Sequence, residues 1–170
     1  MKNTSLGYSH YEVLLKAFVD LVQQAIGDQV VSIVLYGSVA RGKARPDSDV
    51  DLLLILRQPP AAYSKRLQPL LPLLRRLRQE TCWRKLEEQG LIPFLSLLVL
   101  SLEEAKENRY LYLDMIEEAR ILLDQEGFFQ DKLESLRRRL EELGAKKIRR
   151  NEDWYWDLKP DLKLGDVIIL

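Results

Sequence analysis

Two aspartates separated by one residue give this sequence its clearest chemical signal. Asp49 and Asp51 stand at the start of an apolar run, residues 52–56. Side chains two residues apart on a strand point to the same face, so the carboxylates would lie about 6–7 Å apart. Two such charges need a cation between them, or a proton on one of them. Carboxylate oxygens suit Mg²⁺, which completes its shell with water and phosphate oxygens.

A small polar pair, Gly37 and Ser38, follows another apolar run, residues 30–35. Glycine lets the backbone approach a ligand closely, and serine is a good first residue for a short helix. The Ser38 hydroxyl and the free N–H groups beside it would bind an anion. A phosphate cradle and a metal pair, separated by residues 39–48, together describe a nucleotide–metal site.

The two apolar runs that flank this loop are short enough to be buried strands. Ahead of them, residues 8–26 carry apolar side chains every three or four positions, which predicts an amphipathic helix ending at Gly27. Downstream, the pattern predicts a long helix over residues 68–89, a third buried run over 91–100 and a short helix over 109–118. A shorter strand over 119–124, at the sheet edge, and a helix over 128–143 complete the prediction.

At this point the sequence resembles a known family. Gly37-Ser38, ten further residues and Asp49-Val50-Asp51 resemble the signature of the nucleotidyltransferases of the DNA polymerase β superfamily, especially its minimal nucleotidyltransferase branch. Further matches are Ala40, Arg41, Gly42 and Ser48. The motif covers about residues 30–56, and the order of elements extends the likeness to about residue 125. The resemblance implies an α/β fold of the polymerase β-like type, with a small mixed sheet of mostly four strands and flanking helices.

The same resemblance implies roles for the motif residues. Gly37 and Ser38 would hold the phosphates, and Asp49 and Asp51 would be the catalytic residues that bind Mg²⁺ or Mn²⁺. The nucleotide-binding set also includes Arg41 and Ser48, although an arginine in this position could instead brace the loop. The expected substrate is a nucleoside triphosphate, ATP first, whose nucleoside monophosphate passes to a hydroxyl of a protein or nucleic acid.

A third acid is missing where the family usually has one. Active members carry an Asp or Glu on the third strand, which completes the metal site and orients the attacking hydroxyl. Residues 91–100 contain no acid, and Ser96 is our estimate of the matching position. A neutral hydroxyl cannot replace a carboxylate as a base or as a strong metal ligand. The nearest acids that could substitute are Glu103, Glu104 and Asp114.

Two alternatives to an active transferase therefore stay open. One is a catalytically weakened nucleotide-binding protein. The other, which the resemblance suggests, is the antitoxin of a toxin–antitoxin pair whose partner is a small helical protein with a nucleotide-binding domain.

Length and composition set the broader limits. With 170 residues and 46% hydrophobic content, the chain suits one domain, which we place at residues 1–150. Basic and acidic residues number 26 each, so net charge argues neither for nor against binding of nucleic acid.

A single cysteine, Cys82, allows no intrachain disulfide and fits a reducing compartment. Without a leader or an apolar run of membrane length, we expect a cytoplasmic protein. The lone histidine, His10, is interpreted as a surface residue.

The remaining residues, 151–170, form a tail of different composition. Aromatic residues 154–156 lie beside several basic residues and could bind a nucleic-acid single strand by stacking. We favour a tail that docks on the domain or on a second copy of the chain, because residues 167–170 are apolar and β-prone. A homodimer would be a consequence of docking on a second copy.

Overall fold

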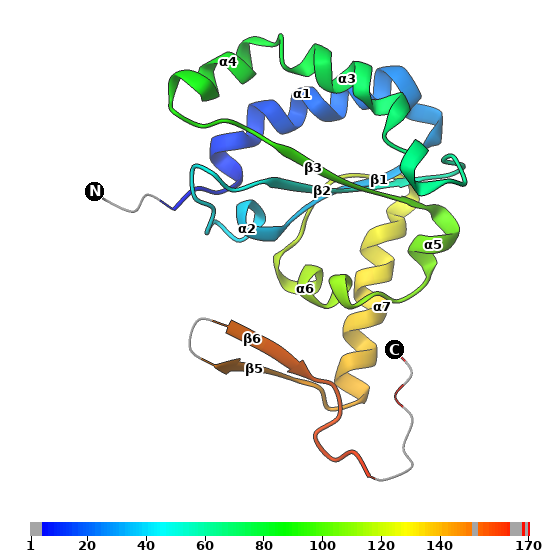
Figure 1. Cartoon of the computed structure of the whole chain (residues 1–170). Coiled ribbons are helices and arrows are strands. Elements are labelled where there is room, and N and C mark those ends of the chain that lie inside the picture. Colours follow the sequence, from blue (N-terminus) through cyan, green and yellow to red (C-terminus); the bar gives the residue numbers. More distant parts are fainter. Residues whose placement is uncertain (1–4, 151–152, 164–167, 169) are drawn as a thin grey trace.

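The core of the protein is a four-stranded sheet with helices on both faces (Figure 1). The computed structural model describes residues 5–150, 153–163, 168 and 170. The strands are β1 (Val30–Tyr36), β2 (Val50–Leu56), β3 (Leu95–Ser101) and β4 (Arg120–Asp124), in the spatial order β3-β2-β1-β4. β2 and β3 are parallel, whereas β1 is antiparallel to β2 and to β4. The expected mixed sheet and the edge position of the fourth strand are confirmed.

The two central strands are buried on both faces, which explains their continuous apolar sequence. Successive residues alternate between two hydrophobic layers because strand side chains alternate in direction. Ile33 and Leu54 belong to the layer under α1, and Val34 and Leu53 belong to the layer that contains α7.

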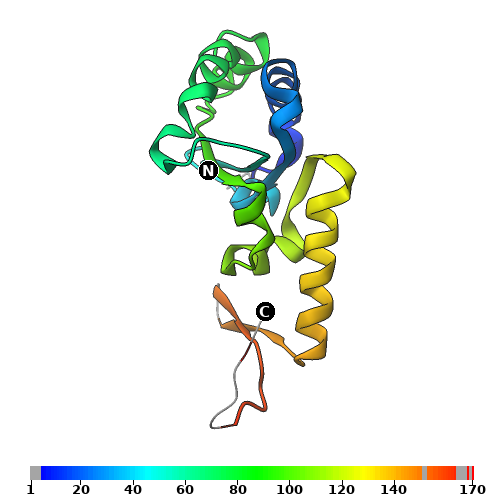
Figure 2. The same cartoon turned by 90° about the vertical axis from the view of Figure 1, so that its right-hand side faces the viewer.

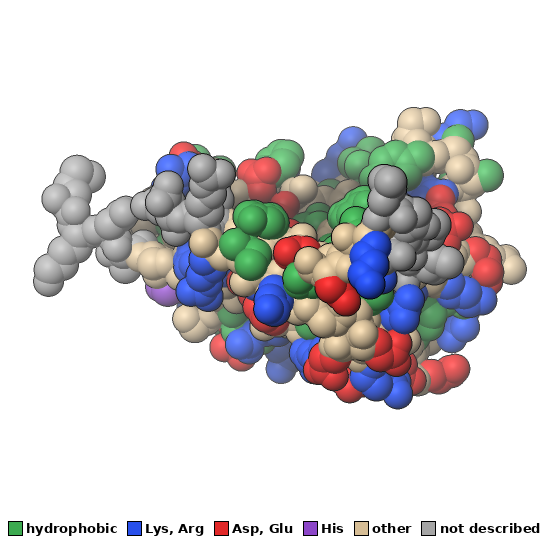
Figure 3. Space-filling model, turned by 90° about the horizontal axis from the view of Figure 1, so that it is seen from below, with side chains coloured by type: hydrophobic (Ala, Val, Ile, Leu, Met, Phe, Trp, Pro, Cys, Tyr) green, Lys and Arg blue, Asp and Glu red, His purple; other side chains and the backbone are tan. Residues whose placement is uncertain are grey.

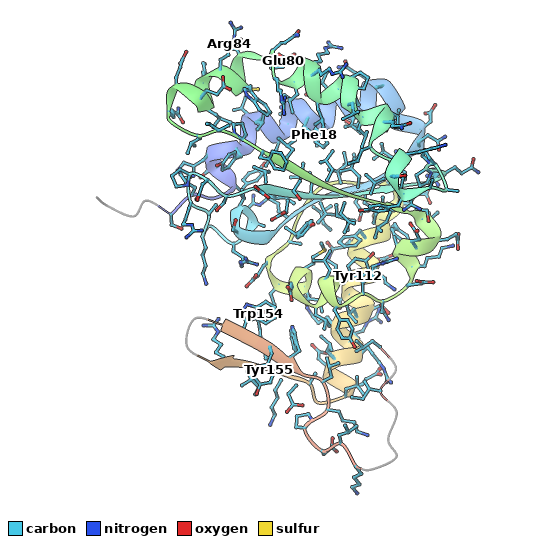
Figure 4. All side chains as sticks on the ribbon, viewed as in Figure 1. Phe18, Glu80, Arg84, Tyr112, Trp154 and Tyr155 are labelled. Atoms are coloured by element: carbon cyan, nitrogen blue, oxygen red, sulfur yellow. The ribbon has the colours of Figure 1, made fainter. Side chains whose placement is uncertain are left out.

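One face of the sheet is covered by α1 (Tyr8–Ile26), α3 (Leu71–Leu77) and α4 (Thr81–Glu88), which lie together in Figure 1. Short 3₁₀ turns, η2 (Tyr63–Lys65) and η3 (Gln68–Leu70), lead into α3, and η1 (Gly27–Gln29) follows α1. The predicted helix over residues 8–26 is confirmed to the residue. Most of its apolar stripe is buried, with Ala25 exposed near the end of the helix, and Phe18 points from the stripe toward the sheet (Figure 4).

The single long helix predicted over residues 68–89 is wrong. The chain breaks between α3 and α4, where the Glu80 backbone is extended at φ −67° and ψ 148°. The break lets Leu77 and Trp83 both bury their side chains in the layer of α1. In one straight helix, side chains six residues apart point in different directions, so the two could not both face that layer. The Arg78 guanidinium lies 5.6 Å from the centre of the Trp83 ring and covers the turn.

The other face carries α5 (Leu102–Lys106), α6 (Tyr110–Glu118) and α7 (Phe128–Glu142), which follows the 3₁₀ turn η4 (Gln125–Gly127). Figure 2 shows α7 running the length of this side of the molecule. Tyr112 and Phe129 hold α6 and α7 together through an edge-to-face contact, with ring centres 5.3 Å apart. The helices expected over residues 109–118 and 128–143 are confirmed within one residue at each end.

Beyond α7, β5 (Lys146–Arg150) and β6 (Asp153–Asp157) form an antiparallel hairpin beside α6 (Figure 1). Trp156, Leu158 and Leu170 pack against the hydrophobic layer of α7, so described parts of the tail contact the domain. The proposed division after residue 150 falls between paired strands and stays a prediction, as does docking on a second copy. Residues 167 and 169 of the apolar end lie outside the described residues. No helix in the described part of the chain is long and apolar enough to span a membrane.

Candidate functional site

The segment from residue 37 to residue 49, called the motif loop below, connects β1 to β2. It begins with the single helical turn α2 (Gly37–Ala40). Backbone hydrogen bonds join Leu6 and Ala44 in both directions, at 2.9 and 3.0 Å, and hold the far side of the loop. The Ser48 hydroxyl accepts a hydrogen bond from the Arg45 N–H at 2.9 Å. Ser48 therefore shapes the loop, and its role toward a nucleotide stays a prediction. The bracing by Leu6 had no signal in the sequence.

Gly37 and Asp51, from the two halves of the motif, meet at the start of the loop. Gly37 has a φ of +73°, and a Cβ built on it would lie 2.2 Å from Asp51 Oδ2. Both the left-handed backbone and the approach of the carboxylate require glycine here. The antiparallel register places Tyr36, which precedes Gly37, opposite Asp51 and so creates this contact.

The Asp51 carboxyl is half-buried, and Asp49 beside it is exposed. Burial raises the pKa of Asp51 above its ordinary value of 3.8, and a hydrogen bond with Ser96 partly offsets this rise. The negative charge of Asp49 raises the pKa further, and Arg41 lowers it. Within the described ranges, neither aspartate forms an ion pair with Lys, Arg or His. These are the surroundings of a carboxylate pair that fits a divalent cation, because a metal would balance the two charges.

Ser96, our estimate of the third-acid position, lies on β3 directly beside Asp51 in the parallel register. Described side chains form no group of three or more His, Cys, Asp or Glu residues that could hold a metal. Glu104 is committed elsewhere, since its two oxygens lie 2.6 and 3.0 Å from the guanidinium nitrogens of Arg66. Glu103 pairs with Lys106 on the exposed surface of α5. Among the described residues, no other acid therefore joins Asp49 and Asp51 in a group that could hold a metal.

Ser38 is half-buried and is the second residue of α2, which begins at Gly37 rather than at Ser38. Its carbonyl accepts a hydrogen bond from the Lys43 N–H at 2.9 Å, which closes the helical turn. Binding of phosphate by its hydroxyl stays a prediction.

Arg41 connects the motif loop to α6. Its Nη1 lies 3.5 Å from Oε2 of Glu118, the last residue of that helix. The same Glu118 is 3.6 Å from Lys147 Nζ of β5, and Lys147 also pairs with Glu117 at 2.7 Å. The Lys147 ammonium lies 4.0 Å from the centre of the Trp154 ring on β6. A chain of charges therefore joins the loop, α6 and the hairpin, on which Figure 4 marks Trp154.

Two arginines of α7 form ion pairs along the helix. Arg137 pairs with Glu134 and donates a hydrogen bond to the Ile116 carbonyl, and Arg139 pairs with Glu142. Figure 3 shows red and blue side chains interleaved on the face that carries the hairpin, rather than a basic stripe. Nucleic-acid binding stays an open alternative to docking of the tail. His10 is exposed, and its Nδ1 lies 3.2 Å from the Gly7 N–H at the start of α1.

Comparison with known proteins gives three findings. Residues 13–163 match the family described as nucleotidyltransferase domain. A 47-residue segment is 47% identical to a protein of Methanocaldococcus jannaschii named as a candidate protein adenylyltransferase. That match covers 28% of this chain and 32% of the relative, so the chain spans only about a third of the length of that protein.

Solved structures of toxin–antitoxin proteins are more distant. One determined with AMP-PNP is 16% identical, with a TM-score of 0.45 over 75% of this chain and 90% of that one. A second, named MntA-HepT, is 13% identical, with a TM-score of 0.43 over 77% of this chain and 90% of that one. At these values the likeness carries no conclusion about a partner, and the helical partner suggested by the sequence stays a prediction.

Proposed function

Since the chain belongs to the nucleotidyltransferase domain family, we propose that it transfers a nucleoside monophosphate from ATP to an acceptor hydroxyl. The acceptor oxygen forms a bond to the α-phosphorus. The bond from that phosphorus to the oxygen that bridges it to the β-phosphorus breaks, and pyrophosphate leaves with that oxygen. The hydroxyl proton passes to solvent, since the described residues offer no third acid in the metal group.

The contact between Gly37 and Asp51 carries this proposal. It places the Asp51 carboxylate against the backbone of the turn where the phosphates would lie. Asp49 and Asp51 would hold Mg²⁺ or Mn²⁺. When bound, the metal supplies positive charge against the phosphate oxygens, where electrostatic stabilisation and positioning contribute most to phosphoryl-transfer rates. Ser38 and the N–H groups around Gly37 would orient the phosphates.

The proposed acceptor is a protein hydroxyl. The support is the name of the Methanocaldococcus jannaschii relative, which matches 47 residues of this chain at 47% identity. A nucleic-acid hydroxyl is the other outcome of the experiment below.

The experiment is transfer of label from α-phosphate-labelled ATP, with Mg²⁺ or Mn²⁺, into proteins and RNAs of an extract of the source cell. We expect a labelled protein band that disappears in the Asp49→Ala/Asp51→Ala variant. The matched control is Asp47→Ala, which removes an exposed loop aspartate paired with Arg45 and should leave the band. Absence of label with the unaltered protein, in an extract where a known transferase works, would contradict the proposal.

One observation favours a second candidate, a nucleotide-binding protein with weakened catalysis. Ser96 stands beside Asp51 where an acid would complete the metal site. The Ser96→Asp variant distinguishes the two candidates. A gain in label transfer of tenfold or more, from a low starting level, would favour the weakened protein, whereas an unchanged or lower rate would favour a transferase that works with two aspartates.

A further inference from the structure

A cavity of about 490 Å³ lies between α6 and the β5–β6 hairpin. Tyr110, Leu111 and Asp114 line it from α6, and Trp154 and Trp156 line it from β6. This volume falls within the range of about 300–1,000 Å³ that is usual for small-molecule sites. From the sequence, aromatic residues 154–156 are expected to dock or to stack on a nucleic-acid strand, and no pattern predicts a cavity.

The lining combines flat apolar surfaces with a few polar atoms. Tyrosine and tryptophan rings offer stacking faces, each worth about 1–3 kcal/mol for a nucleic-acid base. Asp114 is half-buried, and its carboxylate accepts hydrogen bonds. Trp156 Nε1 is buried away from solvent, so this residue contributes its ring rather than its N–H to the lining. A base with an exocyclic amino group complements the Asp114 carboxylate, because the amino group donates a hydrogen bond and the carboxylate accepts it.

The cavity lies close to the motif loop through α6. Asp114 is one helical turn before Glu118, and Glu118 pairs with Arg41 at the end of α2. The ion pair between Arg41 and Glu118 thus links the motif loop to the helix that lines the cavity. To place its base in the cavity, a nucleotide with its phosphates at Gly37 would have to extend past Arg41 and along α6.

The local charge argues for a neutral planar ligand. The Lys147 ammonium already lies over the Trp154 ring at 4.0 Å, so a cationic side chain entering the cavity would meet a like charge. We propose that the cavity between α6 and the hairpin receives the base of the nucleotide, and that Tyr110 and the two tryptophans provide its stacking surface. This inference rests on the proposed function, because it assumes that the triphosphate is held by the motif loop.

Calorimetric titration with two ligands tests it. ATP and inorganic tripolyphosphate are each titrated into the full chain in the presence of Mg²⁺, since they share the phosphates and differ in the nucleoside. The unaltered protein should bind ATP at least tenfold more tightly than tripolyphosphate. Tyr110→Ala removes a stacking face and Leu111→Trp fills the cavity. Tyr110→Ala should weaken ATP binding about five- to tenfold, as expected for the loss of one stacking partner. Leu111→Trp should weaken ATP binding because the larger side chain occupies the cavity, and both variants should leave tripolyphosphate binding within twofold.

Tyr63→Ala is the matched control, because Tyr63 is another exposed tyrosine and lies outside the cavity lining. It should change neither affinity. Tyr110 is 78% exposed, so its removal should not unfold the protein, and thermal unfolding checks the bulkier Leu111→Trp. Equal affinities for the two ligands, or parallel losses of both in the Tyr110→Ala variant, would overturn the base site while tripolyphosphate binding still supports the phosphate site. If tripolyphosphate does not bind the unaltered protein, the phosphate site and the inference built on it both fail.

Discussion

Asp51 and Glu104 are both partly buried carboxyl groups near the ends of parallel strands, yet their surroundings differ in every respect. Glu104 receives two hydrogen bonds from Arg66, whose side chain is only 7% exposed, and another from the Ser101 N–H. These contacts lower the pKa of Glu104 from 4.5 to about 2. Asp51 has a hydroxyl and a second carboxylate beside it, and its pKa is raised.

The difference separates an acid that stabilises the fold from one that we propose to bind metal. Arg66 also donates to the carbonyls of Pro60 and Val99, so its pair with Glu104 fastens the connection after β2 to the outer strand β3. The charge of Glu104 therefore stabilises the fold. The charge of Asp51 is poorly balanced by the protein itself, as is common for acids that bind metal or substrate. The following predictions test whether this contrast holds.

The largest effect on stability is expected for Glu104→Gln. It removes the charge that compensates the buried Arg66 guanidinium and should lower the free energy of unfolding by about 3 kcal/mol. This is the low end of the range for buried pairs, because Glu104 is 37% exposed and water can partly replace it. Urea unfolding at neutral pH measures the loss. Glu103→Gln, at an exposed pair on the same helix, should cost less than about 0.5 kcal/mol, and equal losses for the two variants would refute the contrast.

Gly37→Ala should come next, at about 2 kcal/mol, because it combines a positive φ with a clash against Asp51. It should also weaken Mg²⁺-ATP binding at least tenfold, as measured by calorimetry, since the aspartate must move. Gly90→Ala is the matched control, with a φ of +77° and no atom within 4 Å of the new Cβ. The control should cost about 1 kcal/mol and leave binding unchanged. A binding loss of the same size in Gly90→Ala would show that the contact with Asp51 is unimportant.

Asp51→Asn should have the opposite sign of effect on stability. The folded state disfavours the charge of Asp51, so neutral asparagine should leave the free energy of unfolding unchanged or raise it by up to about 1 kcal/mol. The same variant should lose Mg²⁺-dependent label transfer. Urea unfolding and the transfer assay, run on one preparation, measure both. A clear loss of stability would mean that Asp51 has a structural role after all.

The pH dependence of these variants should be the smallest and most specific effect. Since the pKa of Glu104 is lowered, its stabilisation is present above pH 4.5 and lost as pH falls toward about 2. Since the pKa of Asp51 is raised, the stabilisation from its protonated carboxyl is present below pH 3.8. It is lost as pH rises through the higher folded-state pKa. Unfolding curves from pH 7 to pH 3 should show the Glu104→Gln deficit shrinking below pH 4.5. The Asp51→Asn advantage should shrink as pH falls through the raised folded-state pKa of Asp51 and be lost below pH 3.8. A Glu104→Gln deficit that grows on acidification would contradict the assignment for Glu104.

Much of the fold follows from local pattern. Residues 30–35 and 52–56 are apolar without interruption and form strands buried on both faces, as predicted. Residues 8–26 repeat their apolar side chains at helical spacing and form α1 without a change of boundary. The sequence did not predict the break between α3 and α4, because residues 78–80 include no proline or glycine to mark it.

The candidate site divides in the same way. Residue types and their spacing were enough to predict the family, the short strands around the loop, and Gly37, Asp49 and Asp51 at a spacing suited to phosphate and metal, because these depend on residue type and on the period of a strand. Packing in three dimensions was needed to show that Gly37 touches Asp51, that Ser96 lies beside it, that Arg41 pairs with Glu118, and that an open cavity lies between the hairpin and α6. These contacts join residues far apart in the chain, and strand register and the packing of two hydrophobic layers, rather than local spacing, bring such residues together.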